Sequence, residues 1–192
     1  RGGSVTVDRS RVSGNPSSPD DLTVFSSGGD LRISKSIIDA GGIDAPGAGG
    51  CAIKSEGRTL SLQNSVIQSR NARFACGIDS SAGQTLIAHN TILSHGSNPD
   101  SGFAKGVIAR GDHVSIVNNI LVAASAPDRY PLICSGSPGK GVVAGNVIAD
   151  FSALSFSEVI GCDGLIYSDP DFDFCGADVF GNTIFDGESE SS

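Results

Sequence analysis

No apolar run in this sequence approaches the length of a membrane span, and no signal peptide precedes the first repeat. We therefore expect a protein without a membrane span. Methionine and tryptophan are absent, and aromatic residues make up only 6% of the chain. Because there is no initiator methionine, we expect a processed chain or a fragment, which leaves open a targeting sequence that has been removed.

Basic residues are scarce. The 192 residues include 13 Lys and Arg against 21 Asp and Glu, a formal net charge of −8. This balance argues against nucleic-acid phosphates as a partner. Strong helix formers are sparse too, whereas Val, Ile, Ser, Thr, Asn and Gly dominate, which favours short strands and tight turns. No break in composition divides the chain into two domains.

A repeated block is the main positive feature of the chain. Seven times an apolar strand meets a small polar residue and resumes with an aliphatic pair, as in Leu60–Ile67 and Val114–Leu121. Such a repeat indicates a stacked architecture in which each unit buries its apolar face only against its neighbours. Aligned on the fifth residue, at intervals of 26 to 36 residues, the blocks place in one register Arg9, Lys35, Asn64, Asn90, Asn118, Asn146 and Asn182.

The recurring x-N-[ST]-I corner and the G-x-x-[LV]-x-[IL] strand starts resemble those of the right-handed parallel β-helix in the pectate-lyase-like superfamily. The resemblance covers about residues 5–186. It implies an all-β fold, a right-handed single-stranded parallel β-helix (solenoid) of about six to seven coils. Residues 1–186 are expected to form one domain, with an irregular C-terminal cap at 161–177, and residues 187–192 an acidic disordered tail.

The register of polar residues predicts a structural ladder at one corner of the solenoid. Asparagine tolerates left-handed backbone angles, and stacked amides can hydrogen-bond along the axis. Lys35 and Arg9 interrupt the ladder at its N-terminal end. The alternative is a row of sugar-binding amides. The predicted ladder residues are Asn64, Asn90, Asn118, Asn146 and Asn182.

The resemblance also implies a polysaccharide lyase, hydrolase or epimerase, with acidic and basic residues on the outer face of one sheet. Asp79 and Arg110 on adjacent coils could neutralise a uronate and draw off its C5 proton, with help from Glu56 or Lys105. The alternative is a surface ion pair. The N-T-D, D-D, G-H-G and R-I-K series of the related polygalacturonases is absent from the sequence, which counts against an enzyme.

Five cysteines leave at least one unpaired. Cys51 and Cys76 are expected on neighbouring coils, either bridged or as two small buried side chains. Cys162 and Cys175 flank an irregular stretch and are the better bridge candidates. Any bridge would imply an oxidising, extracellular compartment.

Asp169, Asp171 and Asp173 alternate near the C-terminus and would share one face of a strand. They form either a calcium site or a polar rim beside the last coil. No other cofactor is expected.

These observations favour a non-catalytic module at the cell surface or outside the cell, adhesive or filament-building, within a larger protein. Its expected partners are other protein chains or polysaccharide. The uncapped first coil would allow end-to-end self-association. The alternative is a polysaccharide lyase or epimerase that acts on acidic glycans.

Overall fold

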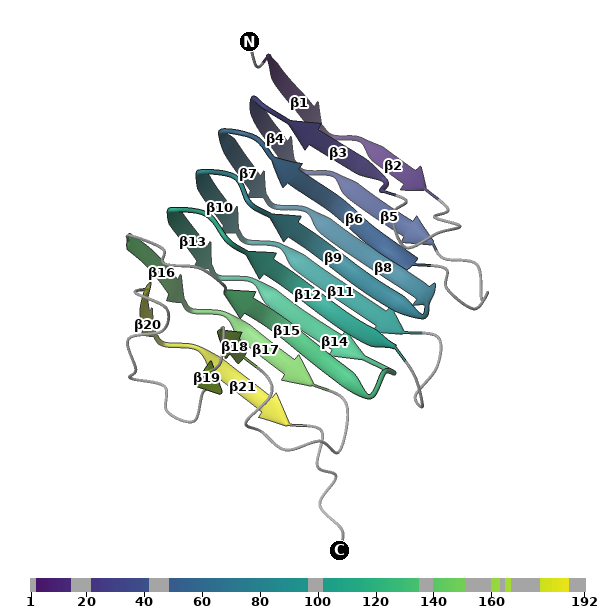
Figure 1. Ribbon diagram of the computed structural model, residues 1–192, viewed down its shortest axis with the longest axis vertical. Coiled ribbons are helices and arrows are strands. Elements are labelled where there is room, and N and C mark those ends of the chain that lie inside the picture. Colours follow the sequence, from purple (N-terminus) through teal and green to yellow (C-terminus); the bar gives the residue numbers. More distant parts are fainter. Residues whose placement is uncertain are drawn as a thin grey trace, which may run out of the picture.

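The computed structural model describes residues 3–14, 22–41, 49–96, 102–134, 140–150, 160–162, 165–166 and 177–186. In these residues the regular structure is β-strand. Figure 1 shows the strands stacked as successive rungs, with the two termini at opposite ends of the stack. The described part of the chain contains no helix with the length and apolar character that crossing a membrane requires.

The strands form three sheets. Sheet A contains β1 (Ser4–Asp8), β4 (Asp30–Ser34), β7 (Thr59–Gln63), β10 (Gln84–Ala88), β13 (His113–Val117), β16 (Lys140–Ala144) and β20 (Ala177–Phe180). Sheet B contains β2 (Arg11–Gly14), β5 (Ile37–Gly41), β8 (Val66–Ala72), β11 (Thr91–Gly96), β14 (Ile120–Ala124), β17 (Val147–Asp150) and β21 (Thr183–Asp186). Sheet C contains β3 (Val24–Ser27), β6 (Gly49–Glu56), β9 (Phe74–Ser80), β12 (Phe103–Ala109), β15 (Asp128–Cys134), β18 (Ile160–Cys162) and β19 (Leu165–Ile166).

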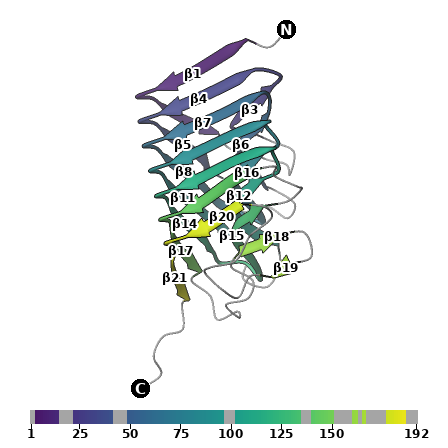
Figure 2. The ribbon, with the colours of Figure 1, turned by 90° about the vertical axis from the view of Figure 1, so that its left-hand side faces the viewer.

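Apart from β18 and β19, which are neighbours in sheet C, consecutive strands belong to different sheets, and each strand pairs with the strand one turn earlier or later. The pairs are parallel except for β18 with β19. The fold is therefore an all-β parallel solenoid with three sheets, which Figure 2 shows from the side of sheet A.

The regular part of the solenoid is shorter than the sequence predicted. Strands of five to eight residues build four turns, from β4 to β15. The outer turns contain shorter strands: β2, β3, β17 and β20 have four residues and β18 has three. The regular solenoid thus has about four turns rather than six to seven, because the prediction counted a full coil for each repeat block.

The core lies between the three sheets and consists of aliphatic rows that run along the stack. In sheet C, Ile53, Ile78, Val107 and Leu132 are in register and fully buried. Each such side chain contributes about 1.5–3 kcal/mol through its burial. Sheets A and B supply equivalent rows, which include Leu31, Ile33, Leu60, Leu62, Ile87, Ile116, Ile38, Ile67, Ile92, Leu121 and Ile148.

A two-residue corner joins each strand of sheet A to the next strand of sheet B. Its first residue has a left-handed backbone, with φ between 46° and 63° at Arg9, Lys35, Asn64, His89, Asn118, Gly145 and Gly181. Its second residue forms the polar ladder. These second residues are Ser10, Ser36, Ser65, Asn90, Asn119, Asn146 and Asn182.

Along the ladder, the backbone N–H of each residue donates to the side-chain oxygen of the next, at 2.9–3.1 Å. The asparagine amides also donate to backbone carbonyls of the preceding turn. Asn119 Nδ2, for example, donates to the carbonyl of Ile87 at 2.9 Å. The ladder therefore satisfies buried backbone groups at a corner where no strand pairing can do so.

The predicted ladder register needs a correction at four turns. The exposed residues Arg9, Lys35, Asn64 and Asn118 occupy the left-handed position, while Ser10, Ser36, Ser65 and Asn119 form the rungs. The ladder therefore continues through its N-terminal end, where the sequence had predicted an interruption. Alignment of the blocks on their apolar starts could not distinguish the left-handed position from the ladder position. In the pair Asn118–Asn119, for example, either asparagine is suited to either position.

Candidate binding faces of the solenoid

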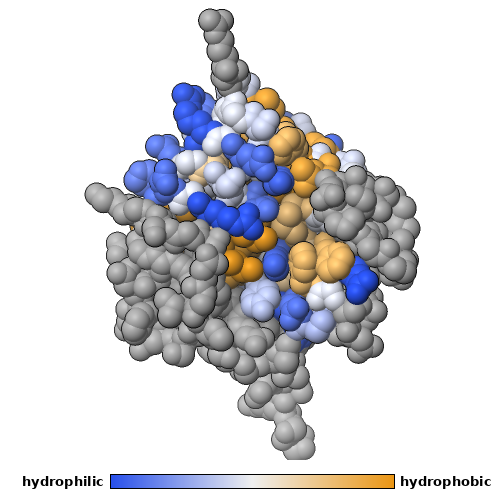
Figure 3. Space-filling view, viewed as in Figure 1, coloured by the Kyte–Doolittle hydropathy of each residue, from blue (hydrophilic) through white to orange (hydrophobic). Residues whose placement is uncertain are grey.

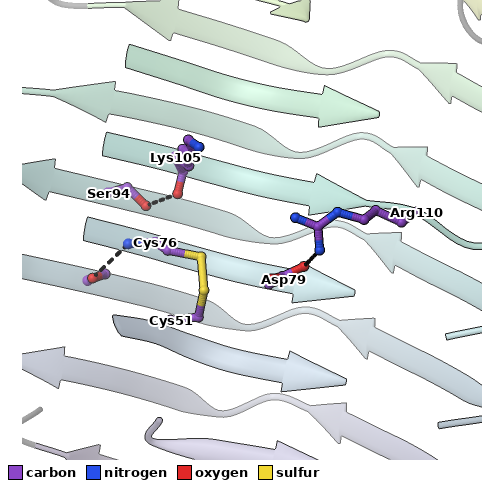
Figure 4. Close-up of a disulfide and its surroundings, with 7 residues drawn as sticks. Cys51, Cys76, Asp79, Ser94, Lys105 and Arg110 are labelled. Carbon is purple, nitrogen blue, oxygen red and sulfur yellow. Dashed lines mark hydrogen bonds and ion pairs between the residues drawn. A yellow bond between two sulfur atoms is a disulfide. The ribbon is translucent and has the colours of Figure 1, made fainter. Parts of the chain in front are cut away.

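The outer face of sheet C brings together the residues that the sequence predicted as catalytic. Arg110 follows β12, and its guanidinium forms an ion pair with Asp79 of β9 at 2.5 Å (Figure 4). Glu56 forms a second ion pair, with Lys54, at 2.8 Å. The two ion pairs are neighbours, because Lys54 of β6 is in register with Asp79 of β9.

These pairs limit the chemistry that the face can perform. The hydrogen bond to Glu56 is the largest influence on Lys54 and raises the pKa of its ammonium group. Arginine stays protonated in proteins, so Arg110 supplies a fixed positive charge and no base. The side chain of Asp79 is only 17% exposed and is held by Arg110. In this arrangement the carboxylate of Asp79 accepts a hydrogen bond from Arg110, and the carboxylate of Glu56 is paired with Lys54.

Aromatic and basic side chains form a second cluster on the same face. Phe74 and Phe103 are in register on β9 and β12, and their ring centroids are 5.0 Å apart. The Nζ atom of Lys105 lies 4.3 Å from the ring centroid of Phe103 and 6.0 Å from that of Tyr130. The guanidinium of Arg73 lies 5.3 Å from the ring of Phe74. Figure 3 shows apolar and hydrophilic residues side by side on the surface seen in Figure 1.

Within this cluster, the pKa of Lys105 is lowered from its ordinary value. Burial lowers the pKa of its ammonium group, the charge of Arg110 lowers it further, and Asp128 and Asp79 oppose this effect. The rings of Phe103 and Tyr130 offer the ammonium group cation–π contacts in place of water.

The sequence interpretation named Lys105 but missed the aromatic cluster. A signal was present, since F-A-x-G occurs in two successive coils, as Phe74–Gly77 and Phe103–Gly106.

A disulfide crosses two turns beside this cluster. Cys51 of β6 and Cys76 of β9 are in register, with their Cα atoms 4.3 Å apart, and their sulfur atoms are bonded (Figure 4). For the pairing of Cys162 with Cys175 the structure gives no test. The backbone of Cys162 belongs to β18, while Cys175 lies outside the described residues.

A groove occupies the outer face of sheet A, which the sequence interpretation did not consider. It has a volume of about 660 Å³ and crosses β1, β4, β7, β10 and β13. A second cavity of about 440 Å³ adjoins it and shares Thr59, Gln84 and His113. The groove is lined by Thr6, Arg32, Ile33, Ser34, Thr59, Leu60, Ser61, Gln63, Gln84, Thr85, Leu86, His113 and Ser115.

The predicted calcium site falls outside the described residues, because Asp169, Asp171 and Asp173 are not among them. The proposed cap at 161–177 and the acidic tail at 187–192 lie largely or wholly outside them too. Among the residues that are described, no three His, Cys, Asp or Glu side chains lie close enough to hold a metal ion.

Comparison of the chain with protein-family models, with curated proteins and with solved structures finds no match. The fold itself defines the class of protein, a parallel β-solenoid with three sheets. The resemblance to the pectate-lyase-like superfamily stays a prediction.

Proposed function

We propose that this chain is a non-catalytic extracellular module, a surface, adhesive or filament-building segment whose faces contact other protein chains or polysaccharide. One observation carries the proposal. Of the side chains expected to catalyse a reaction, Arg110 and Asp79 pair with each other, and Glu56 pairs with Lys54.

Two further features support this role. The bond between Cys51 and Cys76 fits an oxidising compartment, and hence a secreted or surface protein. A solenoid of stacked turns also presents extended faces, which suit contact with a long partner. We take the solenoid to be right-handed, because crossovers between parallel strands have this hand in about 98% of cases.

Incubation with a panel of acidic polysaccharides tests the proposal. We expect no unsaturated product by ultraviolet absorbance, no new reducing ends and no epimerised sugar by NMR. Arg110→Ala serves as the matched variant. Robust activity that is lost in Arg110→Ala would show that the Asp79–Arg110 pair is catalytic and would overturn the proposal.

A lyase or epimerase is the second candidate, and Lys105 is the observation that favours it. Its lowered pKa makes the neutral amine more accessible, near Asp79 and Arg110. If the chain is a lyase or epimerase that uses Lys105 as its base, the variant Lys105→Gln should have no activity on any polysaccharide that the wild type converts. The rate of the wild type should rise with pH as Lys105 loses its proton.

A further inference from the structure

The groove on sheet A has an extended shape that follows the stack. Its five strands face the viewer on the side shown in Figure 2. Because neighbouring strands are about 4.8 Å apart, the groove runs for roughly 19 Å along the solenoid axis. A linear chain could therefore lie across all five strands.

The pairing of the strands explains why this face is hollow. The middle row of outward side chains reads Thr6, Arg32, Ser61, Leu86 and Ser115, strand by strand. Three of these five are short hydroxyl residues, which form a low floor. Longer side chains, including Gln63 on one side of the floor and Gln84 on the other, form the rims.

The lining is rich in groups that both donate and accept hydrogen bonds. Hydroxyls come from Thr6, Ser61 and Ser115, and amides from Gln63 and Gln84, whereas the hydroxyls of Ser34 and Thr59 are already bonded to Asp8 and Asp30. Leu86 is the outward aliphatic residue of the middle row. Such a surface suits a ligand that carries many hydroxyl groups and offers little to an apolar helix.

Arg32 adds a positive charge to this polar groove. It is exposed and forms no hydrogen bond or ion pair with another described residue. The nearby carboxylate of Asp30 is already engaged, since Arg58 binds its two oxygens at 2.9 and 2.6 Å. The guanidinium of Arg32 is thus available to an anion, which it can bind through two parallel N–H groups.

The net charge of −8 does not describe the solenoid faces. The described residues contain 12 Lys and Arg and 10 Asp and Glu, a net of +2. The remaining residues carry the acidic excess of the chain. The described residues as a whole therefore carry no excess of negative charge, although the carboxylates of Asp8 and Asp30 lie beside the groove.

We propose that the groove on sheet A binds a polyhydroxylated chain that bears anionic groups, either carboxylates or sulfate esters. Arg32 binds the anionic group, while the hydroxyl and amide side chains bind the hydroxyl groups of the same chain. This inference rests on the proposed role as a binding module, but it assigns the ligand to sheet A and not to the face of Asp79 and Arg110.

Affinity electrophoresis and calorimetry with the 192-residue chain test the proposal, with a polyuronate, dextran sulfate and neutral dextran as probes. We expect one or both anionic polymers to bind, and neutral dextran to bind far more weakly. Binding of the polyuronate would identify carboxylates as the anionic groups of the ligand, and binding of dextran sulfate would identify sulfate esters. Arg32→Gln should weaken binding about tenfold, because it removes a charge-assisted contact. Ser61→Phe should also weaken it, because the ring would fill the floor.

Arg11→Gln is the matched control, since it removes the same charge from the outer face of sheet B. It should bind like the wild type, and circular dichroism should show all variants folded. The proposal is overturned if no probe binds, if neutral dextran binds equally well, or if Arg32→Gln and Arg11→Gln behave alike. Degradation of the polyuronate would overturn the proposed non-catalytic role and not the binding proposal. In that case, binding of dextran sulfate would still test whether the groove binds an anionic chain.

Discussion

Asn119 shows how one buried side chain serves two turns of the solenoid. Its Oδ1 accepts from the backbone N–H of Asn90 at 2.9 Å. Its Nδ2 lies 2.9 Å from the carbonyl of Ile87 and 3.0 Å from that of Val117. The residue before it, Asn118, has an exposed side chain and a φ of 54°. Two adjacent asparagines therefore have different physical tasks, hydrogen bonding and left-handed backbone geometry.

We predict that Asn119→Ala lowers the free energy of unfolding by about 2–4 kcal/mol, because it leaves several buried backbone groups without partners. Asn118→Gly should change it by less than about 0.5 kcal/mol, because glycine adopts positive φ without strain. Urea unfolding followed by circular dichroism measures both. Equal losses in the two variants would contradict the assignment of the ladder to Asn119.

At the scale of strands, the disulfide between Cys51 and Cys76 is a covalent link between β6 and β9. Cys51 and Cys76 are 25 residues apart, so the bond closes a loop of intermediate length in the unfolded chain. Figure 4 shows it close to Lys105 on the same face. The bond therefore stabilises the part of sheet C that also carries the aromatic cluster.

The double variant Cys51→Ala and Cys76→Ala should lose about 3 kcal/mol of unfolding free energy relative to the wild type, chiefly because its unfolded chain is less constrained. Urea unfolding under non-reducing conditions measures the loss. The circular dichroism spectrum should stay that of the wild type, because both positions are held by strand pairing. An unchanged urea midpoint would mean that the bond is absent in solution.

Strand registers were harder to predict than strands. Leu86 and Ile87 are both apolar, so alternation alone does not say which faces the core. The structure buries Ile87 fully and places Leu86 in the outer groove. A shift of one residue exchanges the two faces of a strand, and with them every candidate site on the outer surface.

At the scale of the whole molecule, stability depends on contacts between neighbouring turns. β10 has a partner on each side, β7 and β13, whereas β1 pairs with β4 alone. Val7 and Val12 of the first turn are only partly buried against the core. Solenoids of this kind open from their ends, because an end turn can separate without disturbing the others.

Hydrogen exchange followed by mass spectrometry should therefore show a gradient along the isolated chain. We expect amides of β1–β3 to exchange at least about tenfold faster than those of β10 and β13, because an end turn opens at a lower free energy. Binding of a second copy to the first turn would slow β1–β3 as protein concentration rises. Uniform protection at all concentrations would indicate one cooperative unit and contradict the prediction.

The amino-acid sequence by itself determined the repeating unit, because alternating apolar residues and a small polar corner are local features that each turn repeats. It also placed Asp79 and Arg110 on adjacent turns. Only the tertiary structure decided that Asn119 rather than Asn118 is buried, that Glu56 pairs with Lys54, that Cys51 bonds to Cys76, and that sheet A carries a groove. Apart from the Glu56–Lys54 pair, which lies within β6, each of these depends on which residues from different turns lie side by side, and that is set by strand register.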